Sequence, residues 1–144
     1  MSQTGIGYFA EAITFQIDQA DSVAQWINLV VEQEQKSIES INFIFCSDEY
    51  LHKINLEYLN HDTYTDVITF PYNADPVEGD IFISIERIRE NAKEYGVSFE
   101  DELHRVMVHG TLHLLNYLDK TDEEKKQMTR LENKYLQLLA LKPN

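Results

Sequence analysis

The stretch FEDELHRVMVHGTLHLLNYLD, Phe99 to Asp119, carries a helical apolar stripe and two histidines four residues apart. Ser98 precedes it, and acidic residues follow three and four positions later, which is typical of a helix start. The apolar stripe is Leu103, Val106, Met107 and Leu114. Four residues turn a helical side chain by about 400° and advance it by about 6 Å, so His109 and His113 leave one face close together. The stretch predicts a core helix carrying a pair of imidazoles.

A third ligand for a metal ion has to come from beyond the helix. Asn116 lies where the helix must end, and asparagine tolerates the left-handed conformation of such an end. That turn would bring Asp119 back to the histidines, giving two nitrogens, one oxygen and an open position, as in catalytic zinc sites. Asp122 is the alternative third ligand, although it also suits the first turn of a following helix. The pattern predicts one Zn²⁺ or another divalent transition metal, and the alternative is a helix with two histidines and no metal.

The other histidines have weaker claims to the site. His104 points about 140° away from the pair on the same helix, so we expect a surface or partly buried residue. His52 and His61 have no partner at ligand spacing and are not expected to take part. Lys120 follows the proposed carboxylate ligand and is the cation expected to bind substrate at the mouth of the cleft, although it equally suits a solvated position before a helix.

Gly110 follows the first histidine of the pair, where zinc proteases carry a glutamate as general base. Its presence disfavours peptide hydrolysis. Glycine costs a helix interior about 1 kcal/mol relative to alanine. We therefore expect that a substrate or a neighbouring backbone approaches this position closely.

Cations on the neighbouring helices are expected to be ordinary surface charges rather than a basic face: Arg87, Arg89, Lys93 and Arg105.

Four short segments have the pattern of strands. Residues 12–17 alternate Ile13, Phe15 and Ile17 on one side. Residues 40–46 are rich in β-branched and aromatic side chains, and a third strand is expected from Val67 to Phe70, stopped by Pro71. A fourth is expected within residues 76–85, after a turn at Gly79.

Five helices are expected between and after these strands. Their starts are Asp21 or Ser22, Ser47, Ser84, Ser98 and Thr121, with Glu124 completing a capping box in the last. The helix from Ser84 should end at Gly96, and the last helix should bury Met128, Leu131, Tyr135 and Leu138. The fold class is α+β: a mixed four-stranded sheet with about five packed helices, one of them a zincin-like HxxxH metal helix.

Composition limits the class of protein. The chain has 144 residues, 43% of them apolar, and we expect one domain over residues 1–144. Cys46 is the single cysteine, which excludes a disulfide scaffold and favours a buried inert thiol. The sequence has neither a secretory signal pattern nor a membrane-length apolar run, so we expect a cytoplasmic protein. The formal charge of -13 opposes unaided binding to nucleic acid, although a divalent cation can reverse the sign of one cleft.

Three blocks of the sequence are informative together: TDVITFP, EGDIFIS and HGTLHL. They resemble the YbeY family of bacterial rRNA maturation factors. HGTLHL from His109 to Leu114, with Tyr117, is similar to the family signature H-G-x-L-H-L-x-G-Y-D-H. TDVITFP (Thr65–Pro71) resembles T-[ND]-V-L-S-F-P, and EGDIFIS (Glu78–Ser84) resembles L-G-D-I-x-I-S. The blocks occur in the family's order, so the resemblance covers nearly the whole chain.

The resemblance implies a metal-dependent, single-strand-specific endoribonuclease that acts in rRNA 3′-end maturation and small ribosomal subunit biogenesis. It implies RNA, ribosomal small-subunit proteins and an assembly GTPase as partners, and neither a membrane nor DNA. Two positions depart from the family. Asp119 stands where the family has its third histidine, with Met128 keeping the family offset, and Leu59 stands where the family commonly has an arginine.

His109 and His113 are the residues expected to carry catalysis, acting as metal ligands rather than proton-transfer groups. An ion at this site would lower the pKa of water toward about 7 and polarise a phosphoryl oxygen. Two other functions stay open. One is a non-catalytic ribosome-assembly factor with a structural metal, which Leu59 favours; the other is a zinc peptidase, which Gly110 disfavours.

Overall fold

The computed structural model describes residues 5–139 and 141. The elements in that part of the chain are β1 (Ile6–Glu11), α1 (Ala20–Gln33), β2 (Ile38–Cys46), α2 (Asp48–Leu59), β3 (Val67–Ala74), β4 (Val77–Ser84), α3 (Ile85–Tyr95), α4 (Phe99–Leu114) and α5 (Asp122–Leu136). The sheet has the order β1-β2-β4-β3, and its pairs are parallel except for the antiparallel β3 and β4. The predicted α+β class, with its mixed four-stranded sheet and five helices, is confirmed.

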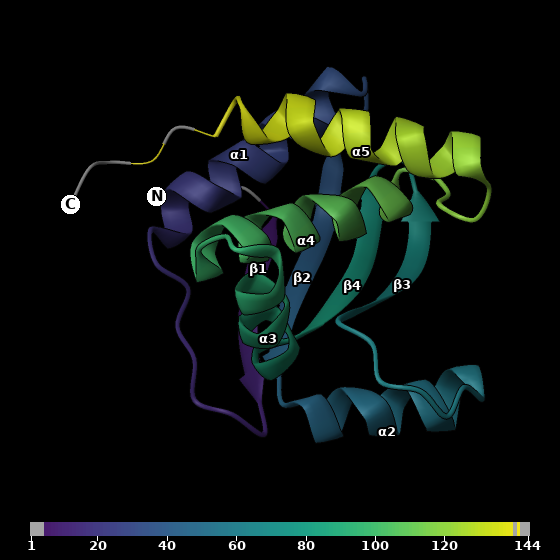
Figure 1. Ribbon diagram of the computed structural model, residues 1–144. Helices are drawn as coiled ribbons and strands as arrows, with labels where there is room; N and C mark the ends of the chain where they lie inside the picture. Colours follow the sequence, from purple (N-terminus) through teal and green to yellow (C-terminus); the bar gives the residue numbers. More distant parts are fainter. Residues whose placement is uncertain (1–4, 140, 142–144) are drawn as a thin grey trace.

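The two faces of the sheet carry cores of unequal size. Alternate residues of β2 point to opposite faces, and Ile41, Phe43 and Phe45 join the main core formed with α1, α4 and α5. Cys46 joins a smaller cluster with Leu51 and other residues under α2. Figure 1 shows α1, α4 and α5 gathered on one side of the sheet and α2 apart from them. The helix that carries the two histidines therefore lies in the larger core.

Most helix starts follow the predicted capping rules. The side chains of Ser47, Ser84, Ser98 and Thr121 each accept a hydrogen bond from the backbone N–H three residues later, and Thr121 forms the full capping box. The predicted start of α1 at Asp21 or Ser22 is wrong, because the helix begins at Ala20 after Gln19 in the left-handed conformation. Gly96 ends α3 at φ 68°, as expected.

The predicted strand at residues 12–17 is wrong. Ile13, Phe15 and Ile17 do point toward the core, but this segment has no strand partner among the described residues. The strand lies just before this segment: β1 runs parallel to β2 and ends at Glu11. The next residue, Ala12, has a φ of 60°, which is outside the extended region. Alternating burial therefore indicated the inward side chains and not a hydrogen-bonded ladder.

Two turn assignments in the β3–β4 hairpin are also wrong. β3 continues through Pro71 to Ala74, which is possible because β3 is the edge strand and the missing N–H of proline costs no ladder bond on the free side. The turn lies at Asp75–Pro76, and Gly79 lies within β4 opposite Pro71.

Gly79 and Gly110 allow α4 to pack closely on the sheet. A Cβ added to Gly110 would lie 2.8 Å from the Cγ2 atom of Ile81 in β4, and one added to Gly79 would lie 2.7 Å from a methyl carbon of Leu114 in α4. A larger side chain at Gly110 would therefore clash with the sheet, as expected. The approaching group is a buried side chain of the sheet rather than a substrate or a backbone.

Cys46 is buried, and burial, with the charges of Asp48 and Glu11, raises the pKa of its thiol to about 12. None of the helices in the described ranges is long and apolar enough to cross a membrane.

Candidate metal centre

The end of α4 has the turn that the metal hypothesis requires. Asn116 has φ 74°, and the N–H of Tyr117 donates to the carbonyl of Leu112 at 3.0 Å while the N–H of Asn116 donates to that of His113 at 3.0 Å. This pair of bonds is a Schellman motif, in which a left-handed residue reverses the chain. The reversal brings Asp119 back beside the helix that has just ended.

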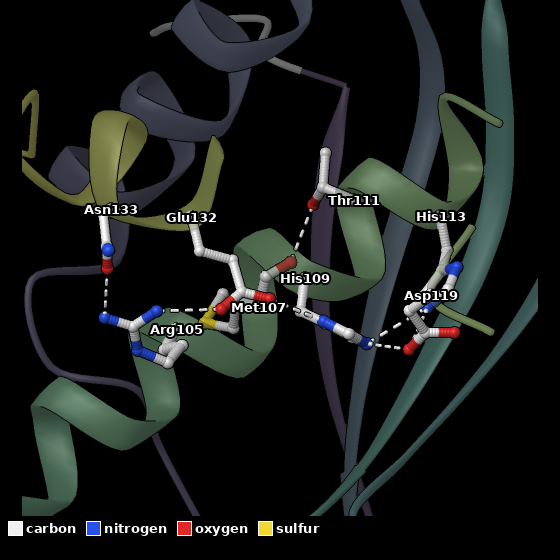
Figure 2. Close-up of polar contacts among 8 residues, drawn as sticks. All are labelled: Arg105, Met107, His109, Thr111, His113, Asp119, Glu132 and Asn133. Carbon is white, nitrogen blue, oxygen red and sulfur yellow. Dashed lines mark hydrogen bonds and ion pairs between the residues drawn. The ribbon is translucent and has the colours of Figure 1, made fainter. Parts of the chain in front are cut away.

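The structure brings His109, His113 and Asp119 together. The two Nε2 atoms are 3.1 Å apart, and the Oδ2 atom of Asp119 is 3.3 Å from each of them (Figure 2). They are the one group of three or more histidine, cysteine and acidic side chains in the described part of the chain whose ligand atoms lie close enough to share an ion. All three side chains are partly exposed, so the shared point is open to solvent.

These distances fit a tetrahedral metal site. Zinc bonds to nitrogen and oxygen of about 2.0–2.2 Å place neighbouring tetrahedral ligands about 3.3–3.6 Å apart. The three observed separations lie at or just below this range, so a small divalent ion fits with slight outward movement of the ligands. A fourth position would face solvent. The residues present therefore suit one Zn²⁺ or a similar ion.

A buried carboxylate holds the first histidine in place. Glu132 of α5 is 7% exposed, and its Oε2 atom lies 2.7 Å from Nδ1 of His109. Its other oxygen accepts a hydrogen bond from Arg105 at 2.8 Å, and Arg105 also donates to the side-chain oxygen of Asn133 at 2.7 Å. Figure 2 shows this chain of contacts running from α5 through His109 to Asp119. The bond to Nδ1 orients the ring so that Nε2 faces the proposed ion.

The surrounding charges act on the pKa of His109 in opposite directions. Burial lowers it, but the hydrogen bond and charge of Glu132, together with the charges of Asp119 and Asp66, outweigh burial, so the pKa is raised. The pKa of Asp66 is itself raised by burial, against backbone hydrogen bonds and the charges of His109 and Arg87 that lower it. A site that stabilises a positive imidazole in this way is electrostatically suited to a cation.

A cavity of about 450 Å³ opens in front of the three side chains. Lys120 lines it, and so does Leu59, which stands where the family that the sequence resembles commonly has an arginine. No arginine lines it within the described residues. His61, which was not expected in the site, also lines this cavity from the loop before β3. Sequence spacing gave no signal for His61, because the loop that delivers it is far from α4 in the chain.

Other predicted residues lie elsewhere. Asp122 lies in the first turn of α5 and is not part of the ligand group, as its role in the helix start suggested. His52 pairs with Asp62 at 2.9 Å, outside this cavity. The expectation for His104 is wrong, because it is buried at 4% exposure.

The structure corrects the expectation for Arg105 and adds Glu132, which was not among the expected site residues. Arg105 was expected as an ordinary surface charge but pairs with Glu132 beside the metal centre. The buried face of α5 is Met128, Glu132 and Tyr135, whereas Leu138 is exposed. A glutamate four residues after Met128 and three before Tyr135, on the apolar face, was the signal that could have identified this carboxylate.

Comparisons with known proteins agree with this architecture. A sequence profile of the family described as "Endoribonuclease YbeY" matches residues 9–140. Relatives with that description include proteins of Amoebophilus asiaticus (48% identical over 138 residues, 94% of each chain) and Flavobacterium psychrophilum (49% over 137 residues, 94% of this chain and 98% of the relative). One from Porphyromonas gingivalis strain W83 is 42% identical over 135 residues, 93% of this chain and 89% of its own.

A solution structure of a Thermotoga maritima protein has a similar fold. Its TM-score is 0.68 at 28% sequence identity, over 93% of this chain and 88% of that chain. The profile and the relatives each cover most of the chain. The chain belongs to the YbeY family.

Proposed function

We propose that the protein is a metal-dependent endoribonuclease specific for single-stranded RNA, acting in rRNA 3′-end maturation and small ribosomal subunit biogenesis. The observation that carries the proposal is the group of three ligand atoms 3.1–3.3 Å apart at the floor of an open cavity. Membership of a family described as an endoribonuclease supplies the substrate class. The proposal treats residues 1–144 as one domain and places it in the cytoplasm.

His109, His113 and Asp119 would hold the ion, which when bound supplies a Lewis acid that stabilises negative charge on phosphoryl oxygens. Glu132 keeps Nδ1 of His109 occupied and so keeps its Nε2 available as a ligand. Lys120 lies where it can contact a phosphate at the cavity mouth. Leu59 offers no charge there, so fewer cations contact the phosphate than the family pattern provides.

The net charge of -13 bears on how the protein reaches RNA. An acidic protein repels a free phosphate backbone, and the attraction is confined to the metal centre. We propose that ribosomal small-subunit proteins and an assembly GTPase bring the enzyme to its substrate. Their role compensates for weak unaided binding.

A non-catalytic assembly factor with a structural metal is the second candidate. The specific observation in its favour is the cavity wall, where Leu59 replaces a cation and no arginine is found among the described residues. A zinc peptidase is disfavoured, since Gly110 packs against Ile81 and supplies no general base.

The test is cleavage of a labelled single-stranded RNA, with and without a chelator, by the parent and by His113→Ala. His52→Ala is the matched control, because His52 lies on α2 and outside the metal cavity. We expect cleavage by the parent and the control, and none by His113→Ala or after chelation. Unfolding of His113→Ala, together with an inactive parent, would favour the structural ion instead. Cleavage of casein but not of RNA would favour the peptidase.

A further inference from the structure

A second, larger cavity lies beside the metal centre. It has a volume of about 770 Å³ and is bounded by α4, α5, the end of α3 and Asp66, the residue before β3. His109 and Asp66 line both this cavity and the one in front of the metal ligands. The two cavities therefore adjoin at His109, and a molecule held at the metal centre can extend into the second.

Four carboxylates line this second cavity: Asp66, Asp101, Glu102 and Glu132. Asp101 is exposed in the first turn of α4, and the partners of the other three differ. Both oxygens of Glu132 are engaged, by His109 and by Arg105. Asp66 receives backbone hydrogen bonds and lies 3.4 Å from the amide nitrogen of Asn91. Glu102 is 6% exposed, and its carboxylate has no hydrogen-bond partner within the described residues. Its oxygens are not among the described side-chain atoms that are fully buried without a partner, so they reach the cavity and can accept hydrogen bonds from a ligand there.

The surroundings of Glu102 disfavour its negative charge. Burial raises the pKa of its carboxyl, the charges of Asp66 and Glu132 raise it further, and Arg105 only partly offsets them. A ligand that brings N–H groups to the two oxygens would compensate for the lost hydration.

The rim of the same cavity is apolar and exposed. Tyr95 at the end of α3 is 62% exposed, and Val97 and Leu141 are also exposed. Large exposed apolar side chains around one cavity are typical of a binding site. An exposed tyrosine ring beside apolar side chains suits the flat face of a nucleobase, which stacks on aromatic side chains in single-stranded RNA recognition.

We propose that this second cavity binds an unpaired guanine base next to the phosphate held at the metal centre, with Glu102 accepting its N1–H and N2–H groups. The assignment rests on the proposed action on RNA. Guanine is the base that places two N–H donors side by side on one edge. Adenine and cytosine place an acceptor next to their amino group, and uracil flanks its single N–H with two carbonyl oxygens. One carboxylate with two free acceptors matches the guanine edge.

The experiment is calorimetric titration of the metal-loaded protein with nucleoside 5′-monophosphates, which have no phosphodiester bond to cleave. We expect guanosine monophosphate to bind about 10- to 100-fold more tightly than the inosine, adenosine, cytidine and uridine nucleotides. Inosine monophosphate is the informative comparison, because it lacks only the N2 amino group. Equal affinity for guanosine and inosine monophosphates in the unmodified protein would overturn the proposal without any mutation.

Glu102→Gln should remove this preference, since an amide keeps the volume and replaces one acceptor with a donor. Glu100→Gln is the matched control: it removes the same charge from α4 at an exposed position that does not line the cavity. Tyr95→Ala should weaken all five nucleotides together. Persistence of the guanosine preference in a folded Glu102→Gln variant would overturn the assignment of this carboxylate.

Other outcomes separate the inference from the proposed function. Metal-dependent cleavage of RNA with no preference among the nucleotides would overturn the guanine site and leave the nuclease intact. Guanosine-selective binding without cleavage of any RNA would support the site and count against the nuclease. Binding of N-acetyl-arginine amide, lost in Glu102→Gln, with no binding of guanosine monophosphate would overturn the base site in favour of a peptide site.

Discussion

Replacing Glu132 with glutamine tests how far a residue outside the ligand group controls the metal centre. In the parent, Glu132 accepts from Nδ1 of His109 at 2.7 Å and from Arg105 at 2.8 Å. Glutamine has one acceptor oxygen and one amino group. It can satisfy one of these two donors and turns an N–H toward the other. The substitution is nearly isosteric, so packing of α5 against α4 is kept.

The expected loss follows from the geometry of the contact. A bond of 2.7 Å is at the short end for a charge-assisted N–H···O bond, and at 7% exposure it is screened little by water. Loss of such a carboxylate behind a metal-binding histidine costs about 10- to 100-fold in metal affinity, or about 1.4–2.7 kcal/mol. We therefore expect Glu132→Gln to bind Zn²⁺ about 10- to 100-fold more weakly than the parent.

The assay is competition for Zn²⁺ between the protein and a chromophoric chelator at neutral pH. Glu123→Gln is the control, because it removes the same charge from the exposed first turn of α5. Urea unfolding of the metal-free proteins shows whether the substitution acts on the site or on the whole fold. Equal Zn²⁺ affinity in the parent and in Glu132→Gln would refute the reasoning about the orienting carboxylate.

Three further substitutions test the packing and charge arguments. Gly110→Ala should lower the free energy of unfolding by about 1–2 kcal/mol in urea, because its new Cβ would lie 2.8 Å from a buried methyl group; a more stable variant would contradict this. Burial lowers the pKa of His104 against the charges of Asp101, Glu100 and Asp18, so the contribution of His104 to the stability of the metal-free protein should fall as the pH drops below about 6.5, whereas that of His109, whose pKa is raised, has the opposite sign. The urea midpoint of His104→Gln should therefore rise relative to that of the parent as the pH is lowered from about 8 to about 5, and an unchanged difference between the two proteins would contradict this. Glu34→Gln should cost about 1–3 kcal/mol in urea unfolding, since the buried Tyr135 hydroxyl and that of Tyr117 both donate to this carboxylate; an unchanged midpoint would exclude that role.

The helices were predictable because their signals are local. A serine or threonine cap contacts a backbone N–H only three residues away, so Ser47, Ser98 and Thr121 act almost independently of the rest of the fold. The strands depend on partners. Alternation at residues 12–17 was correct for burial and wrong for pairing, and Pro71 is tolerated only because of the order of the sheet. Neither property is contained in the local sequence.

The metal site shows the same division. HxxxH spacing and the left-handed turn at Asn116 act within eleven residues, and both were predictable from the sequence. Glu132 reaches His109 from 23 residues further along the chain, and His61 faces the site from a different element. Their positions follow from how α5 and the loop before β3 pack, which spacing along one helix does not reveal.

The most direct test of the metal centre is the metal content of protein purified without an affinity tag, measured for the parent and for Asp119→Ala. The parent should contain about one equivalent of a divalent transition metal, and the variant should contain little, because two imidazoles alone bind weakly. Equal metal content in both proteins would contradict the assignment of Asp119 as the third ligand.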